Sequence, residues 1–121
     1  MLSVGPGMRI FLAAGVTDLR KSFDTLAAVV IEVIGDDPLS GHLFLFCNRR
    51  RDRLKVLHWT DSGFWLCAKR LEVGTFNWPD RGTAKVEYSR AELAALLEGA
   101  DILVHRRRRW FNAKKTARNQ R

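Results

Sequence analysis

The chain has 121 residues and a mass of 13.8 kDa, which is enough for one domain with a real core but not for two. Hydrophobic residues make up 46% of it, with four tryptophans and seven phenylalanines, and this composition excludes a disordered chain. The net charge of +8 is placed unevenly, because residues 106–121 hold eight Lys/Arg and no acid, so that the other 13 basic residues balance all 13 acids.

We therefore expect a single α+β domain at residues 1–103 and a basic, flexible tail at residues 104–121. A neutral body with a concentrated cationic tail is typical of an arm that binds phosphates. The alternative is an ordinary charged tail that is retained because it does no harm. Trp110 and Phe111 lie among the cations of the tail. They could anchor the tail on the domain, or they could stack against bases or contact a partner.

The N-terminus and the two cysteines indicate in which cellular compartment the protein acts. The first fifteen residues lack the charged start and the long apolar run of a signal peptide, and no stretch is long enough to cross a bilayer. Cys47 and Cys67 lie among apolar neighbours at no ligand spacing to the histidines, which favours two buried hydrophobic side chains over a metal site or a disulfide. We expect a cytoplasmic protein that has no membrane partner.

The first elements are a strand and a helix. The short apolar run at residues 8–14 predicts a buried strand. A helix follows, with its N-cap at Thr17 or Asp18 and its end at Gly35. One apolar stripe along it comprises Leu19, Phe23, Leu26, Val30 and Ile34. Since most of its other residues are also apolar, we expect this helix to be covered on more than one side.

Three strands come next, at residues 42–48, 54–59 and 64–71. A charged turn at residues 49–53 joins the first two, and a second turn at residues 61–63 joins the others. Because such short turns connect neighbouring strands, the pattern predicts an antiparallel meander.

The last part of the body contains more extended segments and a second helix. Residues 74–79 predict a fourth strand with Phe76 and Trp78 on one face, and residues 85–89 either add a strand or lead into the helix. That helix begins at a capping box formed by Ser89 and Glu92, and it ends at Gly99. The predicted fold is therefore α+β, a small and mostly antiparallel sheet packed by two helices.

The basic residues suggest a surface for nucleic acid. Four arginines in five residues at a hairpin tip favour a polyanion, although charged turns also protect sheet edges. The predicted nucleic-acid-binding residues are Arg49, Arg50, Arg51, Arg53, Lys55, Lys69, Arg70, Arg106, Arg107, Arg108, Arg109, Lys114 and Lys115. We expect several cations of the sheet to project from one side of it. Trp59, Phe64 and Trp65 are near them and could stack on bases, but we favour a core position for all three.

Catalytic motifs are absent from the sequence, which has no Gly-rich phosphate loop and no serine-hydrolase motif. The carboxylates that a metal nuclease would need are Asp18, Asp24, Asp52, Asp61 and Glu72. Structural roles suffice for them, because Asp18 can cap a helix, Asp24 can pair with Arg20 or Lys21, and Asp52 can pair with the arginines around it. We expect no enzymatic activity, cofactor, metal or small-molecule substrate.

Several blocks of the sequence resemble one known family. Residues 15–27, GVTDLRKSFDTLA, are similar to the G-x-T-D-x-R-K-x-F-D-x-L-A signature of the TnpB accessory proteins of insertion-sequence family 66. Further blocks agree in order and spacing, namely residues 37–44, 47–55, 63–64, 69–72, 76–79 and 96–101. The resemblance covers residues 8–103, and the tail is outside it.

The resemblance implies a bacterial mobile element whose transposase is a separate, larger protein. It implies an accessory factor without catalytic activity that acts with DNA or with the transposase. The signature residues Thr17, Asp18, Arg20, Lys21 and Asp24 would then contact the transposase. We carry two main hypotheses, a DNA-binding accessory protein and an adaptor that binds the transposase without touching DNA. An RNA-binding module and a small nuclease are further alternatives.

Overall fold

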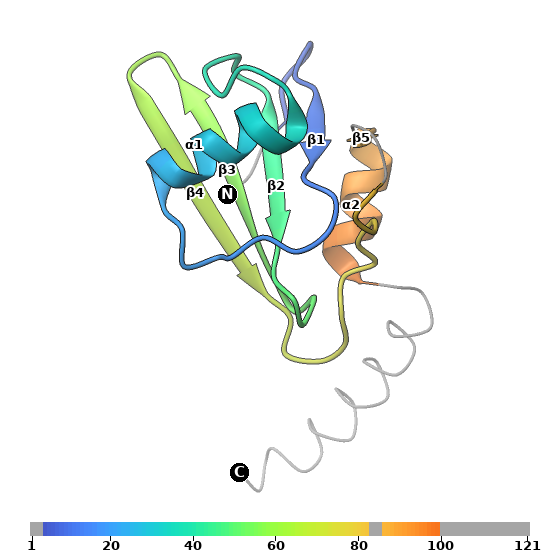
Figure 1. The fold of residues 1–121 in the computed structure, drawn as a ribbon. Coiled ribbons are helices and arrows are strands. Elements are labelled where there is room, and N and C mark those ends of the chain that lie inside the picture. The colour runs from blue at the N-terminus through green and yellow to red at the C-terminus, as the bar shows by residue number, and fades with distance from the viewer. Residues whose placement is uncertain (1–3, 83–85, 100–121) are drawn as a thin grey trace, which may run out of the picture.

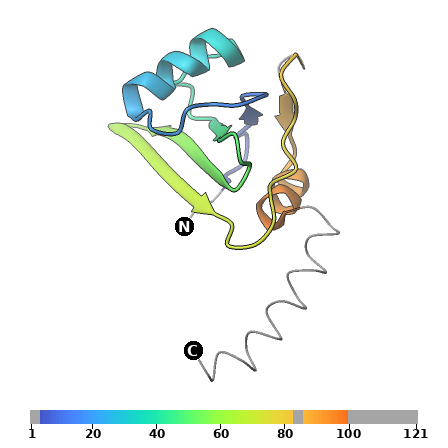
Figure 2. The same cartoon turned by 60° about the horizontal axis from the view of Figure 1, so that its bottom comes forward.

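The protein is built around a five-stranded sheet in the order β4-β3-β2-β1-β5, with a helix on each face (Figures 1 and 2). The structure is a computed structural model, and it describes residues 4–82 and 86–99. The strands are β1 (Ile10–Leu12), β2 (Leu43–Cys47), β3 (Arg53–Thr60), β4 (Gly63–Arg70) and β5 (Val86–Tyr88). The predicted α+β class is confirmed for these residues. The predicted basic tail and the domain boundary at residue 103 lie outside them.

The strands β2, β3 and β4 form the predicted antiparallel meander. In contrast, β1 lies parallel to β2, because the chain between them carries a helix across one face of the sheet. β5 pairs antiparallel with the free side of β1, so residues 86–88 do add a strand. The sheet therefore ends in the long strand β4 at one edge and the short strand β5 at the other.

The first face is covered by α1 (Phe23–Val29), which continues as the π-helical turn η1 (Val30–Ile34). The N-cap is Ser22 rather than Thr17 or Asp18. The helix starts late because residues 17–22 first cross the sheet, with the Thr17 N–H donating to the Cys47 carbonyl oxygen at 2.8 Å. It ends as predicted at Gly35, whose φ of 75° is left-handed.

This helix is covered on one side only, so the prediction of a cover on several sides is wrong. Leu26, Val30 and Ile34 are buried, whereas Ile31 and Val33 are 59% and 56% exposed. Leu19 precedes the helix, and Phe23 at its first position is largely exposed. The buried residues pack against Phe44, Phe46 and Leu57 of the sheet.

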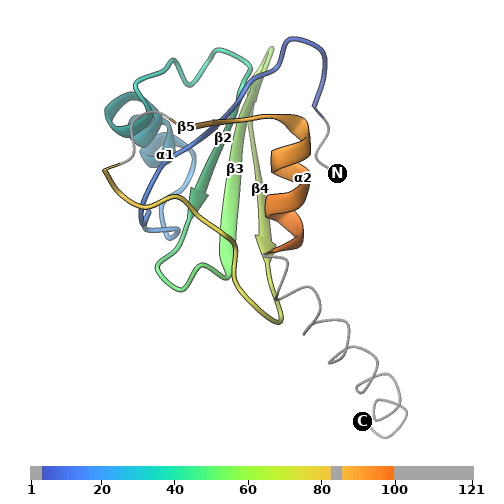
Figure 3. The same cartoon turned by 90° about the vertical axis from the view of Figure 1, so that its right-hand side faces the viewer.

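The second face is covered by α2 (Arg90–Glu98) and by residues 71–82, which run from the β4 edge of the sheet toward the β5 edge (Figure 3). The predicted capping box is present. The Ser89 Oγ accepts from the Glu92 N–H at 3.1 Å, and the Ser89 N–H donates to Glu92 Oε1 at 2.9 Å. Gly99 is the C-cap, as predicted.

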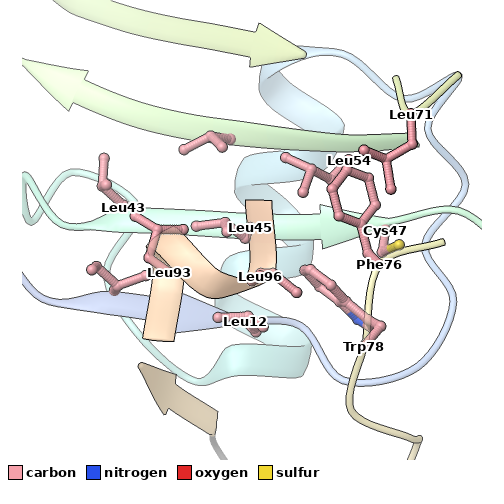
Figure 4. Packing of buried hydrophobic residues seen from close by; sticks show 12 residues of the cluster. Leu12, Leu43, Leu45, Cys47, Leu54, Leu71, Phe76, Trp78, Leu93 and Leu96 are labelled. Carbon is pink, nitrogen blue, oxygen red and sulfur yellow. The ribbon is translucent and has the colours of Figure 1, made fainter. Parts of the chain in front are cut away.

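Residues 74–79 are not a strand, contrary to the prediction. Their backbone makes isolated hydrogen bonds instead of a ladder, for example from the Phe76 N–H to the Arg51 carbonyl oxygen at 2.6 Å. The prediction that Phe76 and Trp78 share a face is correct, since both are buried in the core under α2 (Figure 4). The Trp78 Nε1 also donates to the Ala13 carbonyl oxygen at 3.0 Å.

Candidate nucleic-acid interface

The turn between β2 and β3 is held in shape by Asn48. The Asn48 Oδ1 accepts from the N–H groups of Asp52 and Arg53 at 3.2 and 3.1 Å, and the Asn48 Nδ2 donates to Asp52 Oδ1 at 2.8 Å. The carboxylate of Asp52 therefore accepts a hydrogen bond from the side-chain amide of Asn48. The expected pairing with the neighbouring arginines is not formed. Arg49 and Arg50 lie at the tip of the turn and are exposed.

Arg51 differs from the two arginines before it, because it is part of the fold. Its φ of 60° is left-handed, which is unusual for a residue with a side chain. Its carbonyl oxygen accepts from Phe76, and its Nη2 donates to Asp80 Oδ1 at 2.6 Å. Arg51 therefore ties the turn to the segment that leads to β5, and its charge is balanced by Asp80.

The cations of β3 and β4 do not all project from one side of the sheet. Arg53 pairs in register with Arg70, and both alternate to the same face as Lys55, which is the face that α1 covers. Lys69 alternates to the opposite face, together with its cross-strand partner Leu54. Three of these residues therefore lie on one side of the sheet, in line with the expectation for several cations, and Lys69 lies on the other side.

Lys55 is engaged inside the fold. Its ammonium group donates to the carbonyl oxygens of Leu19 and Lys21, at 2.6 and 3.3 Å. These two carbonyls belong to the loop that precedes α1, so Lys55 fixes that loop on the sheet. The same loop carries the signature residues, and it is held from two directions because the Thr17 N–H bonds to β2.

Within the signature, Gly15 and Thr17 have structural positions. Gly15 has a φ of 79°, and a Cβ added there would lie 2.9 Å from the Cβ of Arg81, so only glycine fits without movement. Thr17 is 7% exposed. These two residues fix the backbone that carries the other signature residues. Among those, Asp18, Arg20 and Asp24 are exposed.

Asp18 and Arg20 form an ion pair at the surface. The Arg20 Nη2 lies 2.8 Å from Asp18 Oδ2, and the Arg20 Nε lies 3.0 Å from Oδ1. The hydrogen bonds from the Arg20 side chain and backbone lower the pKa of the Asp18 carboxyl to about 2. The expected pairing of Arg20 with Asp24 is not formed, because Arg20 is held by Asp18 instead.

A groove of about 800 Å³ brings the signature loop and the basic hairpin together. Its lining residues are Asp18, Leu19, Arg20, Asn48, Arg53, Leu54, Lys55, Ala68, Lys69, Arg70 and Glu72. Residues 18–20 form one wall, and the adjoining ends of β3 and β4 form the other. Lys69 borders the groove at the open edge of the sheet.

The groove is rich in cations, but only some of them lack an internal partner. Arg20 pairs with Asp18, and Arg70 pairs with Glu72 at 2.8 Å. Arg53 and Lys69 have no ion pair with any residue that the structure describes. Together with Arg49 and Arg50 at the adjoining tip, they leave a run of positive charge exposed around the groove.

The sequence did not show the residues that partner these cations. Glu72 could have been found from its position two residues after Arg70, and Asn48 from its place before a turn, where asparagine often bonds the backbone. Asp80 is 29 residues from Arg51, so no local pattern connects the two.

The three aromatic residues near the cations are placed differently from one another. Trp59 and Phe64 are half-buried and make an edge-to-face contact, with ring centroids 5.0 Å apart. Trp65 is 62% exposed on β4, so the prediction of a core position is wrong for it. Trp65 lies on the edge strand and is not part of the core cluster under α2.

Both cysteines are free, Cys47 being buried and Cys67 half-buried. Burial raises the pKa of the Cys47 thiol to about 12. Among residues 4–82 and 86–99, no three His, Cys, Asp or Glu side chains gather in a way that could hold a metal ion. No helix in this part of the chain is long and apolar enough to span a bilayer. The tail cations and Trp110 and Phe111 lie outside the described residues.

Comparisons with known proteins agree with the resemblance seen in the sequence. The family model for IS66 Orf2-like proteins matches residues 8–107. Two proteins of Sinorhizobium fredii, y4hO and y4jC, both named as uncharacterized, are 42% and 35% identical to the chain. The alignments cover 84% and 81% of this chain and 88% and 86% of those proteins. No solved structure matches the chain.

Proposed function

Because the chain belongs to the IS66 Orf2-like family, we propose that it is a non-enzymatic accessory protein of transposition that binds the DNA of its insertion sequence. Membership of the family indicates the accessory role. The binding of DNA, the use of the basic hairpin and groove for it, and action in the bacterial cytoplasm beside the transposase belong to the proposal. The tail cations Arg106–Arg109, Lys114 and Lys115 would add further phosphate contacts.

The observation that carries the proposal is the exposed positive charge around the groove. Arg49, Arg50, Arg53 and Lys69 are exposed, and none of them is neutralised by an acid of the described fold. A duplex carries phosphates at regular short spacing, and cations that are free of internal partners gain most from them by releasing condensed counterions. The turn fixed by Asn48 presents Arg49, Arg50 and Arg53 on a rigid support, which lowers the entropy cost of binding.

The test is a salt titration of the affinity for terminal DNA of the element, measured by fluorescence anisotropy. If tail and turn together meet about six phosphates, log affinity falls with log salt at a slope near −5. The variants Arg53→Gln and Lys69→Gln should each make the slope shallower by about 1. Arg90→Gln is the matched control, since Arg90 is an exposed arginine on α2 and is not among the residues that line the groove.

A slope near zero, or equal losses in Arg90→Gln and Arg53→Gln, would refute the role of the groove. Scrambled DNA and RNA of equal length distinguish specific DNA binding from general affinity for phosphates. Removal of residues 106–121 separates the contribution of the tail from that of the folded domain.

A second candidate function, an adaptor for the transposase, is favoured by exposed apolar side chains beside the signature. A hollow of about 440 Å³ is lined by Val16, Thr17, Asp18, Lys21 and Val33, among others. Of the residues that line it, Val16 and Val33 are 43% and 56% exposed. Exposed apolar residues that gather next to a recessed surface are typical of protein contacts.

Co-purification with the transposase tests the adaptor. Under the adaptor hypothesis the complex survives nuclease treatment and high salt, and Val33→Glu disrupts it while Arg53→Gln does not. If the complex disappears with nuclease, contact through shared DNA explains the association. The variant Leu39→Glu, at another exposed apolar residue, is the control for a general effect of added charge.

A further inference from the structure

The edge strand β4 has features that a solvent-exposed edge normally avoids. It is eight residues long, and within the described part of the chain it has a neighbour only on the β3 side. An open edge of this length presents a row of backbone donors and acceptors to any other strand. It also carries Trp65, which is 62% exposed. A large exposed aromatic side chain on an open edge strand is a feature that a pairing strand from another chain would cover.

We propose that β4 pairs antiparallel with β4 of a second copy, so that the protein is a two-fold dimer with a continuous ten-stranded sheet. With a two-fold axis perpendicular to the sheet, each copy uses the same residues in the contact, so the assembly ends at two copies. It also keeps both α1 helices on one face of the joined sheet. This inference does not depend on the binding of nucleic acid, because it uses only the geometry and side chains of β4.

The sequence of β4 selects one register for this pairing. With Cys67 opposite Cys67 of the second copy, Trp65 faces Lys69 and Phe64 faces Arg70 of that copy, and symmetry doubles each pair. Each cation then lies beside an aromatic ring on its own face of the sheet, an arrangement that stabilises cross-strand pairs.

Other registers lose these pairs or create repulsion. A centre at Leu66 places Lys69 opposite Gly63, and a centre at Ala68 places it opposite Cys67. A centre at Lys69 or at Arg70 sets two like charges against each other, which is destabilising. The pattern of β4 is therefore complementary to itself at Cys67, and this argues for a second copy over an unrelated strand.

Cysteine cross-linking provides a direct test of the register. Opposed residues of an antiparallel pair have Cα atoms about 4.5 to 5.5 Å apart, a separation that a disulfide spans. Mild oxidation of the full-length protein, freed of nucleic acid by nuclease and high salt, should give a covalent dimer. Cys67→Ser should abolish this dimer, whereas Cys47→Ser should leave it unchanged, because Cys47 is buried on the inner strand β2.

Sedimentation equilibrium of the reduced protein tests the contact without a cross-link. We expect a reversible dimer that Trp65→Glu weakens at least tenfold and that Leu39→Glu leaves intact, Leu39 being an exposed apolar residue outside the strands. A protein that stays monomeric up to about 1 mM, where even weak interfaces associate, would overturn the proposal. So would a dimer that forms no Cys67 cross-link and is unaffected by Trp65→Glu.

Discussion

Replacing Lys55 by methionine should destabilise the fold, although this residue was predicted from the sequence to contact nucleic acid. Methionine is unbranched and keeps all but the last atom of the lysine chain, and it removes the donor that bonds the carbonyl oxygens of Leu19 and Lys21. A hydrogen bond from a charged group contributes about 1.5 to 3 kcal/mol, and the shorter of the two contacts is the main one. Urea unfolding followed by tryptophan fluorescence should show a loss in this range, with a Tm lower by more than about 5 °C.

The matched control is Lys69→Met, on the neighbouring strand. Lys69 is exposed and has no ion pair within the described residues, so at concentrations where the protein is monomeric its replacement should change stability by less than about 0.5 kcal/mol. The effect on DNA affinity should be the reverse, with a shallower salt slope for Lys69→Met. Equal stabilities of the two variants would refute the structural role assigned to Lys55.

Three further measurements test individual contacts. The pKa of Asp18 is lowered from 3.8 to about 2 by Arg20, so the pair stabilises the fold above about pH 4 and this contribution is lost as the pH falls through 2. Arg20→Gln should return that pKa toward 3.8 in an NMR titration, and an unchanged value would contradict the assignment. A thiol reagent at pH 8 should modify Cys67 before Cys47, whose pKa is raised to about 12, and equal rates would contradict the burial of Cys47. Ser89→Ala should cost about 1 kcal/mol in thermal unfolding through loss of the capping box, and no loss would show that α2 does not depend on its cap.

The parts of the fold that the sequence predicted are those set by local chemistry. The meander of β2, β3 and β4 follows from short turns, and the start of α2 follows from Ser89 and Glu92 within one helical turn. The parallel pairing of β1 with β2 and the pairing of β1 with β5 were not predicted, because they join segments 33 and about 75 residues apart. Pairing over such separations depends on the whole topology, and no short pattern encodes it.

The errors have a related physical cause. Residues 74–79 have the alternation of a strand, since Phe76 and Trp78 point the same way, but alternation arises in any extended segment that covers a core. Thr17 and Asp18 are both good cap residues, so the sequence predicts the cap at one of them. In the structure the backbone of Thr17 is already bonded to β2, and this long-range contact decides the start of the helix.

For the candidate site, the sequence located the cations. It could not distinguish the cations that bond other parts of the fold from those that are free to contact a ligand. Arg51 and Lys55 lie in the same basic run as Arg49, Arg50 and Arg53, yet the first two are engaged by Asp80 and by backbone carbonyls. A ligand must compete with those partners for Arg51 and Lys55, whereas it meets Arg49, Arg50 and Arg53 without such competition. Binding energy per cation should therefore follow the pattern of internal partners and not the count of basic residues. Because Lys55 bonds the carbonyl oxygens of Leu19 and Lys21, on either side of Arg20, we expect its replacement to loosen the wall of the groove that residues 18–20 form.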